Sequence, residues 1–180
     1  MLKPELQAKF LQHINRKKKN EEGFTLIELL VVVIIIGILA AIALPSLLGQ
    51  VSKAKQAEAK NYVGAVNRSQ QAFFLENQAF ATSLGALQAG IKSQTDNFSY
   101  AIPTTAANAG SFVQISAVAR KAALKSYYGA TYTAIGDTAT SEALTLAVAC
   151  ESTGPATSVT TISSAAAATG CQSNFTSLAR

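Results

Sequence analysis

The sequence has few of the side chains that bind metals or activate nucleophiles. Histidine occurs once, at His13, and the two cysteines, Cys150 and Cys171, form no Cys-x-x-Cys or Cys/His pair. There is no glycine-rich phosphate-binding motif, and the carboxylates after residue 45 are scattered singly. These absences argue against zinc, nucleotide and acid–base chemistry. We therefore expect a protein that is not an enzyme and has no cofactor and no metal site.

Charge is also scarce, at 14% of residues, and it is unevenly placed. Residues 1–23 contain six Lys or Arg and three Glu, whereas residues 24–180 contain nine Lys or Arg and seven Asp or Glu. The overall net charge of +5 therefore overstates the basicity of the larger part. We do not expect nucleic acid to be the primary partner.

What the sequence does have is one long apolar run, from Phe24 to Leu44, in which only Thr25 and Glu28 are polar. As an α-helix, these 21 residues extend about 32 Å, enough to cross a hydrocarbon core of about 30 Å. The apolar core of a cleaved secretory signal is shorter than this. The run therefore predicts a helix that spans a membrane.

Basic residues on both sides of the run bear on its orientation. The cluster Arg16-Lys17-Lys18-Lys19 precedes the run, and such clusters tend to stay in the cytoplasm. Lys53, Lys55 and Lys60 on the far side oppose this signal, but they are less clustered and further from the run. We expect a cytoplasmic amino terminus and a domain on the outer side of the membrane.

The string GFTLIELLVVVIIIGILAAIALP, from Gly23 to Pro45, resembles the amino-terminal signature of type IV pilins and of the related pseudopilins. The resemblance implies cleavage after Gly23 by a prepilin peptidase, N-methylation of the new terminal residue Phe24, and a role in assembly for Glu28. It implies as partners other copies of the chain, a pilus assembly platform and its ATPases. By the same resemblance, the protein is first an inner-membrane precursor and then part of an extracellular pilus.

The position of Glu28 suggests how it would act. An acid inside a membrane is costly, so it usually has a partner or a task. Cleavage before Phe24 would create a positively charged amine, and we hypothesise that it pairs with Glu28 of a neighbouring copy, which partly offsets the cost of burying either charge. Such a pair would also fix the axial register of the helices. The alternative is that Glu28 lies near the interface and stays hydrated.

The helix should continue beyond the membrane, because Ser46–Gln78 keeps a helical rhythm of apolar residues. Pro45 removes a backbone donor and Gly37 is a second weak point, so a kink is expected there. The two parts would form one helix of about 55 residues, or two helices hinged at Pro45. The core-facing side should include Val51, Ala54, Ala59, Tyr62, Val66 and Phe73, and the hydrated side Lys53, Lys60, Asn67 and Gln71.

Four short segments after the helix have the alternation and the bounding turn residues of β-strands. They are Phe98–Ile102, Phe112–Ala119, Tyr127–Ile135 and Leu144–Cys150. We expect a small antiparallel sheet of about four strands with one face on the amphipathic helix. This is an α+β fold, and by the resemblance above it is the type IV pilin fold.

The tail after Glu151 is rich in Ser, Thr, Ala and Gly and is framed by Cys150 and Cys171. In an oxidising compartment the two cysteines should pair, and a disulfide-bounded loop at this place is what the resemblance implies; two reduced thiols are the alternative. The expected organisation is a cleaved leader (1–23), a membrane or filament-core helix (24–44) and an extracytoplasmic domain (45–180) with the loop 150–171.

Three functions fit these features. The leading interpretation is a subunit of a type IV pilus, which by the resemblance serves motility, adhesion or DNA uptake. The second is a pseudopilin of a type II secretion system, in which a calcium site among Asp137, Glu142 and Glu151 is conceivable. The third is a membrane-anchored binding protein that keeps residues 1–23 and never polymerises.

Overall fold

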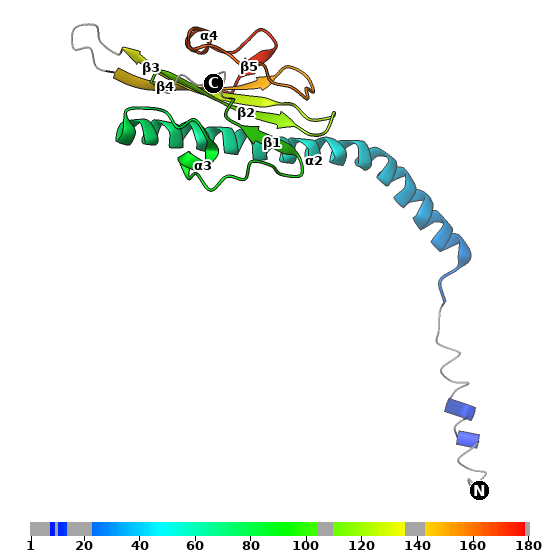
Figure 1. The fold of residues 1–180 in the computed structure, drawn as a ribbon. Helices are drawn as coiled ribbons and strands as arrows, with labels where there is room; N and C mark the ends of the chain where they lie inside the picture. Colours follow the sequence, from blue (N-terminus) through cyan, green and yellow to red (C-terminus); the bar gives the residue numbers. More distant parts are fainter. Residues whose placement is uncertain (1–7, 10, 14–22, 104–109, 136–142, 179–180) are drawn as a thin grey trace. The chain divides into compact units, whose positions relative to one another are not determined.

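A computed structural model of the protein describes residues 8–9, 11–13, 23–103, 110–135 and 143–178. Its main elements are a long helix and one antiparallel sheet (Figure 1). The chain divides into two compact units, Met1–Leu48 and Gly49–Arg180. The long helix contributes to both.

Helix α2 runs from Leu26 to Asn77 and contains Pro45 in its interior. It ends where Gln78 adopts a left-handed conformation, with φ of 54°, and donates its N–H to the Phe74 carbonyl at 2.8 Å. The prediction of one continuous helix is therefore confirmed, and the alternative of two separate helices is wrong. A kink at Gly37 or Pro45 stays a prediction.

The sheet is a five-stranded meander in the order β1-β2-β3-β4-β5, with every neighbouring pair antiparallel. Its strands are β1 (Phe98–Ala101), β2 (Phe112–Ala119), β3 (Tyr127–Ile135), β4 (Ala143–Ser152) and β5 (Phe175–Ser177). The four predicted strands are present: β2 and β3 have the predicted bounds, β1 ends one residue earlier, and β4 begins one residue earlier and ends two residues later. The sequence analysis did not predict β5, because its three residues, Phe-Thr-Ser, are too few to show the alternation of a strand.

One face of the sheet packs on the second part of α2 and forms the main core. The buried helix residues are Ala59, Val63, Val66, Asn67, Gln70 and Phe74. The predictions that Val51 and Ala54 face the core and that Asn67 lies on the hydrated side are wrong, because Val51 and Ala54 are exposed and Asn67 is buried. Its amide donates to the Val148 carbonyl at 3.0 Å, so the polar side chain is buried with a partner.

The close approach of α2 to β3 depends on a glycine. A Cβ at Gly129 would lie 2.5 Å from Asn67 Oδ1 and 2.7 Å from Val63 Cγ1. Only a residue without a side chain fits at this distance. Gly129 therefore sets how closely the helix packs on the middle of the sheet.

The opposite face of the sheet is partly covered by the C-terminal segment, including the short helix α4 (Ser164–Ala168) (Figure 1). Gln114 fixes this segment, since its amide donates to the Thr160 carbonyl at 3.1 Å and accepts from the Ile162 N–H at 2.9 Å. A further short helix, α3 (Leu84–Leu87), follows α2. The domain is therefore layered, with α2 on one side of the sheet and the C-terminal segment on the other.

Candidate assembly site

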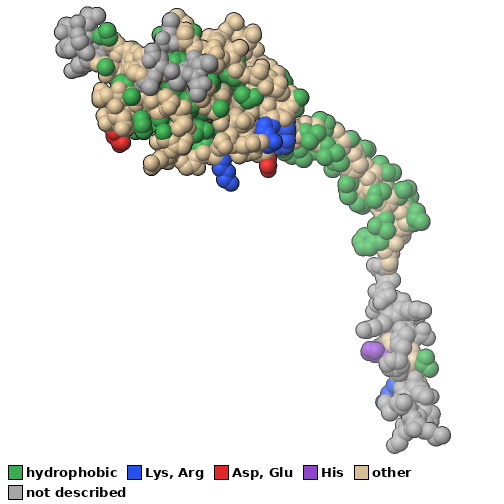
Figure 2. Space-filling view, in the orientation of Figure 1, with side chains coloured by type: hydrophobic (Ala, Val, Ile, Leu, Met, Phe, Trp, Pro, Cys, Tyr) green, Lys and Arg blue, Asp and Glu red, His purple; other side chains and the backbone are tan. Residues whose placement is uncertain are grey.

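The first part of α2 has no cover in the described chain. The bulky apolar side chains from Leu26 to Leu48 are between 48% and 82% exposed, and Figure 2 shows apolar side chains along this part of the helix. By length and composition, α2 contains one segment that could cross a membrane. This surface needs lipid or other protein to remove it from water.

At the start of α2, Thr25 and Glu28 form hydrogen bonds with each other in both directions. The N–H and the hydroxyl of Thr25 both donate to Glu28 Oε2 at 2.8 Å, and the Glu28 N–H lies 3.4 Å from the Thr25 hydroxyl oxygen. This is a capping box, in which each residue satisfies a backbone donor that the helix end leaves free. Sequence reasoning missed this role of Glu28, although the Thr-x-x-Glu spacing before an apolar run is a readable signal.

The other residues predicted for processing and bending are accessible. Gly23 and Phe24 are exposed, and Phe24 is 83% exposed. A Cβ built at Gly23 or at Gly37 meets no described atom within 4 Å apart from its neighbours along the chain. The structure thus brings Phe24, Thr25 and Glu28 together at one helix end and leaves Gly37 and Pro45 further along the exposed helix.

The predicted disulfide is present. Cys150 and Cys171 are bonded, with their Cα atoms 5.8 Å apart. Cys150 is fully buried in the smaller hydrophobic cluster between the sheet and the C-terminal segment. The bond joins β4 to the segment that returns as β5, so it ties the cover of the second face to the sheet.

Glu151 holds two lysines that come from separate elements. Its carboxylate lies 2.8 Å from Lys60 Nζ on α2 and 3.2 Å from Lys125 Nζ before β3. Burial raises the pKa of Glu151, but the hydrogen bonds and charges of the lysines outweigh this, so its pKa lies below the ordinary value. Of the residues in the conceivable calcium site, Asp137 and Glu142 lie outside the described residues, and Glu151 is occupied by these lysines.

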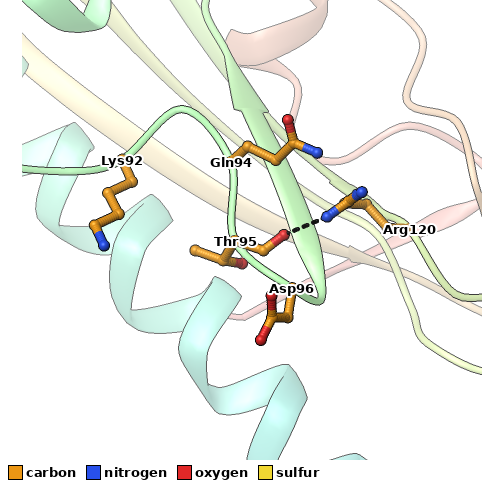
Figure 3. Close-up of a pocket in the computed structure, with 5 residues that line it drawn as sticks. All are labelled: Lys92, Gln94, Thr95, Asp96 and Arg120. Atoms are coloured by element: carbon orange, nitrogen blue, oxygen red, sulfur yellow. Dashed lines mark hydrogen bonds between the residues drawn. The ribbon is translucent and has the colours of Figure 1, made fainter.

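A shallow hollow of about 480 Å³ lies beside β1 and the end of β2, lined by Lys92, Gln94, Thr95, Asp96 and Arg120 (Figure 3). Arg120 Nη1 donates to the Thr95 carbonyl at 2.8 Å. Four of the five lining residues are exposed, and none is placed as a nucleophile with a base. In the described part of the chain, no three side chains of His, Cys, Asp or Glu gather as metal ligands. The exposed start of α2 is therefore the candidate site.

Two family models match the chain. The model described as type IV pilin-like G and H matches residues 56–173, and the prokaryotic N-terminal methylation motif matches residues 18–44. Together with the long helix packed on an antiparallel sheet, these matches define the class. The chain belongs to the type IV pilin-like G and H family and has the type IV pilin fold.

Named relatives fall into two groups. The type IV major pilin protein PilA of Myxococcus xanthus is 44% identical over 68 residues, which are 38% of this chain and 31% of that protein. The type IV wide pilus major component PilA4 of Thermus thermophilus is 35% identical over 91 residues, 50% of this chain and 70% of that protein. The type II secretion system core protein G of Pseudomonas aeruginosa is 36% identical over 81 residues, 45% of this chain and 57% of that protein. The chain thus spans less than two thirds of the first and third of these relatives.

Proposed function

We propose that the chain is a structural subunit of a type IV pilus that polymerises through the first part of α2. The observation that carries the proposal is the uncovered apolar surface from Leu26 to Leu48, which contains a single acid, Glu28, within the matched methylation motif. The pilus components among the relatives support this role. The precursor would be anchored in the inner membrane with its domain outside, and its helix would later exchange lipid for the helices of other copies.

The geometry of Glu28 suggests how one acid serves both states. In the described monomer both Thr25 bonds go to Oε2, and among the described residues Oε1 accepts no bond. After cleavage before Phe24 by a prepilin peptidase, the methylated amine of a neighbouring copy could approach Oε1 while the cap stays intact. Because lipid already solvates apolar helices, association depends on packing and on polar contacts of this kind. The platform and its ATPases would supply the work of extraction.

Substitutions at Glu28 separate the ion pair from the cap. Glu28→Gln keeps a side chain that can cap the helix but removes the charge, whereas Glu28→Ala removes both functions. If the charge sets the register, both variants insert and are processed, and both lose surface filaments in electron micrographs. Filaments of normal number and length from Glu28→Gln would mean that only the cap matters.

Processing is tested at the residue before the cut. Gly23→Val should block cleavage, so that the protein stays in the membrane with residues 1–23 attached. Mass spectrometry of the wild-type cellular protein should find a methylated Phe24 at the amino terminus. An intact Met1 on most of the protein would favour the membrane-anchored binding protein over both filament functions, and normal cleavage of the variant would place the cut elsewhere.

The second candidate is a pseudopilin of a type II secretion system. It is favoured by the relatives named as core protein G of such systems and by the G and H family model. Peptide identification of shed surface fibres separates the two functions. Long fibres composed of this chain support the pilus, and loss of protein secretion without loss of fibres on deletion supports the pseudopilin.

A further inference from the structure

The first charges after Glu28 are two lysines. From Leu29 to Ser52 there are 24 residues without Asp, Glu, Lys or Arg, and then come Lys53 and Lys55. As a helix these residues extend about 36 Å, longer than a hydrocarbon core of about 30 Å but shorter than a whole bilayer of about 40–45 Å. With Glu28 at one interface, the two ammonium groups fall in the headgroup layer of the opposite leaflet.

An uncovered apolar side chain, that of Val51, lies one helical turn before Lys55. Val51, in the second unit, is 48% exposed. It lies outside the run Phe24–Leu44 that defines the membrane helix by sequence, yet it presents the same kind of surface. A long lysine side chain can extend along such a surface and place its charge at the phosphate level. Val51 therefore offers lipid an apolar contact beyond the run Phe24–Leu44.

The arrangement around the helix favours a membrane over a protein partner. Two residues correspond to about 200° of rotation in an α-helix, so Lys53 and Lys55 lie on nearly opposite sides. Charges on opposite sides of the helix suit a helix that enters a lipid surface end on, and they form no one-sided patch for a protein.

Within the described part of the chain, no carboxylate forms an ion pair with Lys53 or Lys55. Among the described residues, the ion pairs of the domain join Glu151 to Lys60 and Lys125. The acid that follows in sequence, Glu58, accepts from Asn97 Nδ2 at 3.3 Å and from the Tyr100 hydroxyl at 3.4 Å. Its carboxylate is held by the sheet side of the domain.

We propose that, in the membrane-anchored precursor, Lys53 and Lys55 bind the phosphate groups of anionic lipids in the leaflet on the domain side. The inference rests on the proposed membrane anchor but not on assembly. Basic residues beside a membrane helix tend to stay in the cytoplasm, whereas Lys53 and Lys55 are expected on the outer side. Lipid binding there would give these two lysines a role at that place. Extraction into a filament would then break the headgroup contacts as well as remove the helix from lipid.

The test uses the full chain in vesicles and a reporter that the sequence permits. The chain has no tryptophan, so Val51→Trp supplies a single one. Its quenching by lipids brominated in the upper acyl chain is measured in phosphatidylcholine with and without phosphatidylglycerol. We compare three backgrounds: native lysines, Lys53→Gln/Lys55→Gln, and the charge-matched control Arg68→Gln/Lys92→Gln, whose two residues are exposed elsewhere in the domain.

We expect phosphatidylglycerol to increase the quenching and shift the emission to shorter wavelength in the native and control backgrounds. The double lysine variant should lose this dependence on lipid charge. The inference is overturned if the native background shows no dependence, if the lysine variant retains it, or if the control variant loses it equally. Flotation with the vesicles is measured in parallel: a chain that floats but fails these criteria leaves the proposed function intact, whereas one that does not float contradicts both.

Discussion

The two parts of α2 differ in where their apolar side chains are buried. From Leu26 to Leu48 the helix is apolar on all sides, and no described residue covers it. From Ala59 to Phe74 one face of the helix is buried, and the sheet covers it. The second part is therefore stabilised within one chain by the hydrophobic effect, whereas the first part must obtain its cover from lipid or from other copies.

This difference has a consequence for assembly. A helix that moves from lipid to a bundle of helices is away from water in both states. The hydrophobic effect therefore contributes little to the transfer, and polar contacts decide the register of the helices. In the proposed assembly Glu28 would supply such a contact, and in the single chain the capping box already gives its carboxylate a partner. Changes in the covered part should alter the stability of the domain, and changes in the uncovered part should alter only insertion or assembly.

The largest effect on the covered part should come from removing the disulfide. Cys150→Ser/Cys171→Ser opens a loop whose closure is worth about 3 kcal/mol in the chain-entropy model, so the free energy of unfolding should fall by about that amount. All five tyrosines lie in the second unit, so near-ultraviolet circular dichroism of the full chain in detergent during urea titration reports this unit alone. An unchanged urea midpoint would mean that the C-terminal cover does not stabilise the domain.

The next largest loss of domain stability should come from crowding the contact between α2 and β3. Gly129→Ala places a Cβ against Asn67 and Val63, and overpacking of this kind costs about 2 kcal/mol. The matched control is Gly154→Ala, where the added Cβ meets no described atom within 4 Å apart from its neighbours along the chain. Equal urea midpoints for the two variants would contradict the close approach of the helix to the strand.

A pair of identical truncations on one helix tests the comparison directly. Val63 is fully buried and Val33 is 59% exposed. Val63→Ala removes two buried methyl groups and should lower the free energy of unfolding of the domain by about 1.5 kcal/mol. Val33→Ala should leave this free energy unchanged. A loss of domain stability in Val33→Ala as large as in Val63→Ala would show that the two parts do not differ as described.

The sequence predicts those features of the fold that depend on local patterns. The long helix, four of the strands and the disulfide follow from an apolar run, from alternation and from two isolated cysteines. The burial of Asn67 and the need for glycine at Gly129 depend on a contact between residues 62 positions apart in the chain, and nothing near either residue indicates it. Of the candidate site, Glu28 was readable from its apolar surroundings, whereas its bond to Thr25 was missed despite a local signal.

The smallest expected effect concerns a charge that ties the covered part of α2 to the sheet. Because the pKa of Glu151 is below its ordinary value in the folded protein, its contribution to stability is present above the ordinary carboxyl pKa of about 4.3 and is lost as the pH falls through the lowered value. Lys60 is 42% exposed and solvent screens the pair, so Glu151→Gln should cost about 1 kcal/mol at neutral pH. The variant should also lose less stability than the wild type between neutral and strongly acidic pH. Asp96→Asn, which removes an exposed acid outside this ion pair, is the control, and an equal change in the pH profile of both variants would mean that the lysines contribute nothing specific at Glu151.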